Sequence, residues 1–419
     1  MHKNNRRIKY YPYICPDFQL NLKFGQYMNS AFIYRDLKNT LQEAFKYMPV
    51  ITLTGPRQSG KTTLCRNLFT DLPYTNLEDA STLAEITTDP KAFLQKYPEG
   101  AIIDEAQNYP QIFSYLQVLV DEDRLLSNAK RHFIVTGSNN FSLLERISQS
   151  MAGRTAILTL LPLSISEIRR YQPEVSTDRL ILNGGYPNIW KLGDESRNIM
   201  LSSYYSTYVE RDLRRLLNVK DLNAFQTFIR LCAGRIGSEY NASALSSEVG
   251  VSVNTINSWT SVLQASYVLY LLQPYYANIG KRLTKTPKVF FRDTGLATYL
   301  LGIHQIEQLK SHPLRGNLFE NMVINGMLAN EMNQGNSPKF YFYRDKGQHE
   351  VDLLKLNDDN SIEAYEIKSA MTFHTIFFKN LRYLKNLFSS QINKTMLVYD
   401  GEGECIQAFD GYCNYRTLF

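Results

Sequence analysis

The chain has 419 residues, of which 44% are hydrophobic, so it is long enough to bury more than one core and to form two to four domains. Its formal net charge of +6 permits contact with nucleic acid, but it is weaker than the charge of a dedicated nucleic-acid binder. The five cysteines are scattered without a CxxC pair, which argues against a structural zinc and for a reducing compartment. No uncharged run reaches membrane-spanning length, so we expect a soluble, cytoplasmic protein.

Residues 1–30 start with a basic run and continue through a tyrosine-rich stretch, and we treat them as an N-terminal extension. In residues 31–48 the apolar side chains recur at helical spacing, and Pro49 closes the segment. This pattern predicts a helix that leads into the first core strand.

A glycine-containing loop follows the apolar run of residues 50–54 and precedes a helical stretch at residues 63–68. Its glycines allow successive backbone N–H groups to point at phosphate oxygens, next to the positive end of the helix dipole. Lys61 is expected to reach the outer phosphates, and the Thr62 hydroxyl to ligate Mg²⁺. The predicted nucleotide-binding residues are Gly55, Pro56, Arg57, Gln58, Ser59, Gly60, Lys61, Thr62 and Thr63.

A short strand candidate at residues 74–78 is followed by an apolar strand, residues 100–103, that ends in two carboxylates. Asp104 is predicted to hold Mg²⁺ through its water shell, and Glu105 to orient and deprotonate the attacking water. The alternative interpretation is an ordinary strand that ends at a polar turn.

A third apolar strand is predicted at residues 132–136, and it has room to lie between the first strand and the acidic strand. Its polar end would then present Ser138 or Asn139 to the terminal phosphate or to the attacking water. These features together predict an α/β fold of the P-loop NTPase type, a parallel sheet with helices on both faces and a glutamate base.

Several further motifs resemble those of prokaryotic AAA-class ATPases that carry a C-terminal domain of unknown function. The motifs lie at residues 143–154, 161–167, 184–187, 208–213 and 292–297. The resemblance runs from about residue 31 to the C-terminus, so it leaves the first thirty residues uncovered. It implies ATP and Mg²⁺ as the ligands of the phosphate loop.

ATPases of this class often complete the site with an arginine, from the same chain or from a neighbouring subunit. Arg154 is the first candidate because it follows a short Ala-Gly break beside the ATPase core, and Arg211 and Arg214 are weaker ones. The alternative for Arg154 is a helix cap or an ion pair with a surface carboxylate.

The middle of the chain predicts a winged helix. A helix at residues 223–233 is followed by two short helices joined at Gly250 and then by strands at residues 268–272 and 289–291. The second short helix contains no Lys or Arg, although Asn254, Thr255 and Asn257 could still read base edges. The basic residues lie in the wing instead, where they suit phosphate contact: Lys281, Arg282, Lys285 and Lys288. A winged helix that serves only as a lid or bracket is the alternative.

The C-terminal region combines a helix from residue 318 with strands at residues 339–344, 350–354 and 364–369. Glu366 and Lys368 are two residues apart on a strand and share a face, and Asp352 is expected beside them on the neighbouring strand. Such a set can hold Mg²⁺ and activate water. It resembles the restriction-endonuclease core, in which a further glutamate comes from an earlier helix. Glu320 matches that glutamate, and Glu350 could assist. The alternatives are a solvent-exposed strand with alternating charges and a fold that has kept binding but lost cleavage.

The predicted domains are an extension (1–30), a P-loop ATPase (31–175), a helical linker or lid (176–222), a winged helix (223–300) and a restriction-endonuclease-like domain (301–419). The sequence favours an ATPase whose nucleotide cycle controls the C-terminal half, with DNA as the expected partner. The main alternative is a slow nucleotide-dependent switch that binds a protein and has no nuclease activity. A DNA-binding regulator and a homo-oligomer are left open.

Overall fold

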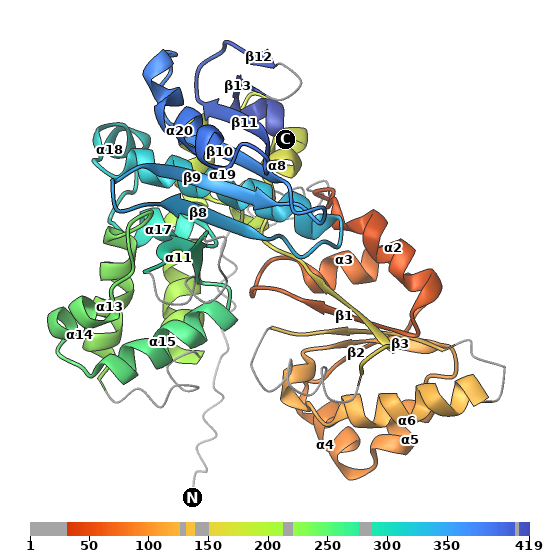
Figure 1. Cartoon of the computed structure of the whole chain (residues 1–419). Helices are drawn as coiled ribbons and strands as arrows, with labels where there is room; N and C mark the ends of the chain where they lie inside the picture. The colour runs from red at the N-terminus through yellow and green to blue at the C-terminus, as the bar shows by residue number, and fades with distance from the viewer. Residues whose placement is uncertain (1–31, 126–130, 139–150, 213–220, 276–285, 407–409) are drawn as a thin grey trace, which may run out of the picture. The chain divides into compact units, whose positions relative to one another are not determined.

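The computed structural model describes residues 32–125, 131–138, 151–212, 221–275, 286–406 and 410–419 (Figure 1). The elements below all belong to one unit that spans residues 34–419. No helix among the described residues is long and apolar enough to cross a membrane.

The first sheet is parallel throughout and has the order β2-β3-β4-β1-β5. The predicted position of the third strand, between the phosphate-loop strand and the acidic strand, is confirmed. All residues of β1 and β3 are buried, as expected for a sheet covered on both faces. The strands are β1 (Val50–Thr54), β2 (Tyr74–Asn76), β3 (Gly100–Asp104), β4 (His132–Thr136) and β5 (Thr155–Thr159).

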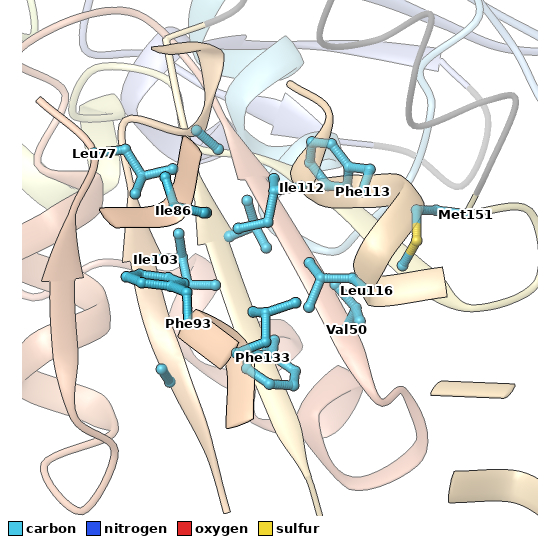
Figure 2. Close-up of a cluster of buried hydrophobic side chains, with 14 of the residues drawn as sticks. Val50, Leu77, Ile86, Phe93, Ile103, Ile112, Phe113, Leu116, Phe133 and Met151 are labelled. Atoms are coloured by element: carbon cyan, nitrogen blue, oxygen red, sulfur yellow. The ribbon is translucent and has the colours of Figure 1, made fainter. Parts of the chain in front are cut away.

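Helices cover the two faces of this sheet with separate apolar cores. The helices α2 (Leu37–Tyr47) and α3 (Lys61–Leu68) pack on the face that carries Ile51 and Ile102. On the other face, α4 (Ala80–Thr88), α5 (Pro90–Gln95) and α6 (Ile112–Leu125) surround Val50 and Ile103, as Figure 2 shows. Successive strand residues point to opposite faces, so each strand contributes to both cores. The helix expected at residues 31–48 starts only at Leu37.

A helical segment connects the first sheet to the rest of the chain. It contains α8 (Ile165–Tyr171), α9 (Thr177–Asn183), α10 (Pro187–Leu192), α11 (Arg197–Tyr204) and the π-helix η3 (Tyr205–Asp212). The short 3-10 helix η2 (Asp194–Ser196) lies between α10 and α11. Further 3-10 helices are η1 (Ala106–Asn108), η4 (Thr375–Phe378) and η5 (Tyr415–Leu418).

The predicted elements of the middle region are present as helices α13 (Leu222–Gly234), α14 (Ala242–Val249) and α15 (Val253–Ala265) and strands β6 (Leu269–Pro274) and β7 (Lys288–Phe291). Asn241 and Ser252 cap α14 and α15, and Gly250 turns the chain between them with a left-handed backbone, φ 77°. The strands β6 and β7 pair antiparallel.

The C-terminal region forms a larger sheet with the order β12-β13-β11-β10-β9-β8-β6-β7. Its last two strands come from the middle region, because Gln273 and Pro274 of β6 pair in parallel with Tyr341 and Phe342 of β8. The regions predicted as two domains therefore share one sheet. The new strands are β8 (Phe340–Arg344), β9 (Glu350–Leu356), β10 (Ile362–Lys368), β11 (Ile392–Tyr399), β12 (Cys405–Ile406) and β13 (Asp410–Asn414). The helices are α17 (Thr294–Leu300), α18 (Ile306–Ser311), α19 (Arg315–Asn333) and α20 (Lys379–Leu387).

Candidate functional site

The phosphate loop connects β1 to α3. A Cβ atom on Gly55 would lie 2.2 Å from the carbonyl oxygen of Leu160, and the backbone φ of Gly55 is 141°, so only glycine fits there. Gly60 caps α3 in the left-handed conformation, φ 93°. The loop therefore leads directly into the N-terminus of α3, where backbone N–H groups favour an anion.

Lys61 lies folded into this loop. Its Nζ atom donates hydrogen bonds to the carbonyl oxygens of Gly55 (3.0 Å) and Pro56 (2.9 Å), and the side chain is only 6% exposed. Burial lowers the pKa of Lys61 to about 8, although the carboxylates of Glu105 and Asp104 act in the opposite direction. The amine is thus buried among neutral acceptors that a phosphate can replace.

Asp104 joins the acidic strand to the phosphate loop. Its Oδ2 atom accepts hydrogen bonds from Thr62 Oγ1 (2.7 Å) and from the hydroxyl of Tyr74 (2.9 Å). Its Oδ1 atom accepts from the backbone N–H of Glu105 (3.0 Å) and from Thr136 Oγ1. The hydroxyl of Thr62 and the carboxylate of Asp104 are adjacent oxygen donors, which fits the preference of Mg²⁺.

Sequence reasoning missed Tyr74 and Thr136 as partners of Asp104. They are 30 and 32 residues away from it in the chain, and only the pairing of β2 and β4 on either side of β3 brings them there. Each of the two residues lies at an end of a predicted strand, and this position is the sequence signal that could have identified them.

Glu105 follows β3 in a left-handed conformation, φ 55° and ψ 42°, which is uncommon for a residue with a side chain. Its carboxylate accepts a hydrogen bond from Gln107 Nε2. Ser138 is buried just past the end of β4, on the edge of the sheet where the phosphate loop also lies. Asn139 lies outside the described residues.

The structure places Arg154 away from the phosphate loop. The residue after it, Thr155, pairs with Val50 at the amino end of β1, whereas the loop leaves the carboxyl end after Thr54, about 13 Å further along the strand. Its guanidinium pairs with Asp121 of α6 at 2.7 and 2.8 Å. The contact is the alternative expected for Arg154, an ion pair with a surface carboxylate, and a role toward the phosphates stays a prediction. The side chains of Arg211 and Arg214 lie outside the described set.

Arg35 is a second residue at this site that the sequence did not reveal. Its guanidinium donates to the carbonyl oxygen of Ser59 in the phosphate loop (2.7 Å) and to that of Leu161 (2.6 Å), and it pairs with Glu167 at 3.0 Å. Both charged side chains are buried. Arg35 therefore ties the phosphate loop to the motif at residues 161–167.

The C-terminal region brings together the side chains that the sequence predicted to converge. Lys368 Nζ of β10 lies 3.1 Å from Asp352 Oδ2 of β9 and 2.7 Å from Glu366 Oε1. Asp352 Oδ2 also accepts a hydrogen bond from the backbone N–H of Ile367 (2.7 Å). Glu320 projects from α19, which packs against β10 (Figure 1).

Lys288 belongs to the same acidic cluster, contrary to the expectation that it lies in a basic wing. Its Nζ atom is 2.6 Å from Glu350 Oε1 and 3.4 Å from Glu320 Oε1. It is buried because β6 and β7 extend the C-terminal sheet beside β8. The other predicted wing residues, Lys281, Arg282 and Lys285, lie outside the described part of the chain.

Burial and neighbouring charges shift the ionisation of this cluster. Burial raises the pKa of Glu320 to about 7 and that of Glu366 to about 8, and Asp352 adds to both shifts. Within the ranges that the structure describes, no three Asp, Glu, His or Cys side chains are arranged to hold a metal ion. Amines stand among these carboxylates instead.

On α15, the exposed side chains include Asn254 and Asn257, Thr255 is half-buried, and Ile256 and Trp259 face the core. The helix thus presents an uncharged polar face to solvent.

The sheet order and the hydrogen bond between Thr62 and Asp104 beside Lys61 define a P-loop ATPase of the AAA class. In agreement, the family model described as an AAA domain matches residues 47–169. Two domains of unknown function match further along the chain, DUF8612 over residues 174–307 and DUF4143 over residues 315–410.

The chain belongs to the same family as the protein named Uncharacterized protein Rv2008c of Mycobacterium tuberculosis. The two are 30% identical over 374 residues, which cover 88% of this chain and 80% of the relative. The Mycobacterium bovis protein named Uncharacterized protein Mb2031c matches with the same values. Among solved structures, the Walker-type ATPase PABY2304 of Pyrococcus abyssi is 13% identical, with a TM-score of 0.43 over 65% of this chain and 97% of that one. A likeness of this degree carries nothing about function.

Proposed function

We propose that this chain binds ATP with Mg²⁺ at the phosphate loop and hydrolyses it, and that the nucleotide cycle controls its C-terminal half. The observation that carries the proposal is the 2.7 Å hydrogen bond between Thr62 and Asp104, with Lys61 buried in the loop beside them. These three groups supply the oxygen donors and the cation that a bound nucleotide requires.

We assign each residue the role that its chemistry and its place in the sequence predict. Lys61 exchanges the carbonyl oxygens of Gly55 and Pro56 for phosphate oxygens when the nucleotide binds. Thr62 and Asp104 would hold Mg²⁺, which supplies charge neutralisation at the phosphates. Glu105 accepts the proton of the attacking water, and Ser138 or Asn139 contacts the terminal phosphate or that water.

Steady-state ATP hydrolysis with Mg²⁺, in the presence and absence of single- and double-stranded DNA, tests the proposal. We expect hydrolysis by the native chain and none by Lys61→Ala, which also serves as the control for contaminating ATPases. Stimulation by DNA would link the ATPase to a DNA-directed C-terminal half. Equal rates in the native chain and in Lys61→Ala would contradict the proposed nucleotide site.

For the C-terminal half, we propose a winged helix that contacts DNA and a restriction-endonuclease-like centre made by Asp352, Glu366, Lys368 and Glu320. The ion pairs of Lys368 with Asp352 and Glu366, at 3.1 and 2.7 Å, support the centre. Asp352→Ala or Lys368→Ala should abolish Mg²⁺-dependent cleavage of DNA and leave ATP hydrolysis intact. Absence of cleavage by the native chain would leave this centre as a binding module.

A nucleotide-dependent switch with a protein partner is the second candidate, and one observation favours it. The amine of Lys288 already pairs with two carboxylates of this region, Glu350 and Glu320, as in a site that no longer performs catalysis. Under this alternative, DNA leaves the rate of ATP hydrolysis unchanged and the nucleotide changes the assembly state, which size-exclusion chromatography with ATP and ADP would show.

A further inference from the structure

Lys288 occupies an unusual place for a lysine at the start of a strand. It is 3% exposed, and its Nζ atom lies 2.6 Å from Glu350 Oε1, 3.4 Å from Glu320 Oε1 and 5.4 Å from the centre of the Phe342 ring. Two carboxylates at these distances stabilise the charged form of the buried amine. The amine of Lys288 therefore contacts carboxylates of the acidic cluster and not solvent.

The cluster contains more negative than positive charge. Four carboxylates face two amines, because Lys288 pairs with Glu350 and Glu320, and Lys368 pairs with Asp352 and Glu366. Arg344 lies 3.6 Å from Glu350 but also pairs with Glu239 at 2.8 Å. The positive charge of Arg344 therefore offsets the negative charge of Glu239 and leaves the charge balance of the cluster unchanged. With every group ionised, two negative charges stay uncompensated, which is the charge of one divalent cation.

A separate observation concerns a buried carboxylate oxygen of Glu366. Glu366 is 4% exposed, and its Oε2 atom is buried without any hydrogen-bond partner, while Oε1 contacts Lys368. A buried carboxylate oxygen without a partner is costly unless a proton or a metal ion satisfies it.

We propose that Lys288 is a tethered counter-ion that occupies the acidic centre in place of a divalent cation and competes with it for Glu320 and Glu350. This inference rests on the C-terminal centre proposed above. The lysine sets the affinity of the centre for metal, since its positive charge repels a second cation and its amine takes two of the carboxylates. Among the described residues, no three carboxylates are arranged to hold one metal ion. This agrees with a centre in which the amines take the place of the metal.

The proposal also implies that two regions build the centre. The four carboxylates lie within residues 315–410, whereas Lys288 lies within residues 174–307, the part that matches a different family model. The shared sheet, in which β6 pairs with β8, brings β7 and its lysine to the centre. A change in the position of β7 would therefore change access of a cation to the carboxylates.

The test is a titration of the full-length chain with Mn²⁺, without nucleotide, in which electron paramagnetic resonance measures free Mn²⁺. All proteins carry Asp104→Asn, which removes the carboxylate beside the phosphate loop as a metal ligand. We expect Lys288→Met to bind Mn²⁺ at least tenfold more tightly than the chain with native Lys288. Lys288→Arg, which keeps the charge, should leave the affinity unchanged, and Asp352→Asn should remove the binding in either background.

Removal of the buried Lys288 charge can prevent folding, so a second pair of variants extends the test. Lys288→Met combined with Glu350→Gln removes both members of the ion pair and leaves no unpaired charge from it. This double variant should bind Mn²⁺ more tightly than Glu350→Gln alone, and circular dichroism would verify that both are folded.

The outcomes separate the inference from the proposed centre. Binding that depends on Asp352 but is equal or weaker after removal of Lys288 would overturn the counter-ion role and leave the centre standing. Absence of Asp352-dependent binding in every variant would overturn both. Tighter binding in both lysine-free variants, lost with Asp352→Asn, supports the proposal.

Discussion

The phosphate loop and the C-terminal acidic centre both contain buried lysines, yet their charge balance is opposite. Lys61 contacts only backbone carbonyl oxygens, and burial lowers its pKa to about 8. Lys288 and Lys368 each contact two carboxylates, which raise their pKa values against the effect of burial. The first arrangement favours an anion near the lysine, and the second favours a cation near the carboxylates. The partners that a buried lysine has in the free protein thus indicate which ligand charge each site requires.

The largest expected effect concerns Glu105 at the phosphate loop. Glu105→Gln should keep ATP binding and reduce turnover by a factor of about 10²–10⁴, because the amide cannot accept the proton of the attacking water. Single-turnover hydrolysis and a fluorescent nucleotide titration measure the two properties separately. Turnover at the native rate would show that another group is the base.

The next effect is on stability near the phosphate loop. Arg35→Met leaves the buried carboxylate of Glu167 without its cation, so the free energy of unfolding should fall by about 3–5 kcal/mol. The double variant Arg35→Met with Glu167→Gln should lose clearly less. Urea unfolding of both would measure the difference, and equal losses would mean that the carbonyl contacts of Arg35, not its charge, matter most.

The acidic centre should make stability depend on pH. The pKa values of Glu320 and Glu366 are raised to about 7 and about 8 from 4.5, so the folded chain binds more protons than the unfolded chain between those values. Their contribution to stability is therefore present below about pH 4.5 and is lost as the pH rises to about 8. Between pH 6 and 8.5 we expect a loss of roughly 1–3 kcal/mol.

Urea unfolding at a series of pH values, with Glu366→Gln as the control, tests this dependence. The variant should show a smaller slope because its amide does not titrate. A stability that rises from pH 6 to 8.5 in the native chain, with no such change in the variant, would contradict the assignment. Addition of Mn²⁺ at pH 8.5 should restore part of the loss.

The smallest effect concerns Arg154. Its ion pair with Asp121 is partly exposed, so Arg154→Ala should cost no more than about 1 kcal/mol in unfolding free energy. At dilutions where the chain is monomeric, ATP hydrolysis should stay at the native rate. A tenfold or greater drop there would mean that Arg154 reaches the nucleotide of its own chain after a rearrangement.

Local chemistry was readable from the sequence by itself. The glycine loop with Lys61 and Thr62, the carboxylates at the end of an apolar strand, and the spacing of Glu366 and Lys368 each depend on residues a few positions apart. The geometry of helices and strands determines how such residues lie, so their convergence could be predicted. The strand inserted between β1 and β3 was also predictable, from the length of the interval between Lys61 and Asp104.

Only the tertiary structure decided which distant residues complete these sites. Tyr74 and Thr136 reach Asp104 through strand order, Arg35 reaches Ser59 and Glu167 through packing, and Arg154 is separated from the loop by the length of a strand. Lys288 enters the acidic centre because β6 pairs with β8, a register that no short pattern encodes. Contacts between residues far apart in the chain depend on how whole sheets assemble. The free energy of that assembly comes from the entire fold and not from one motif.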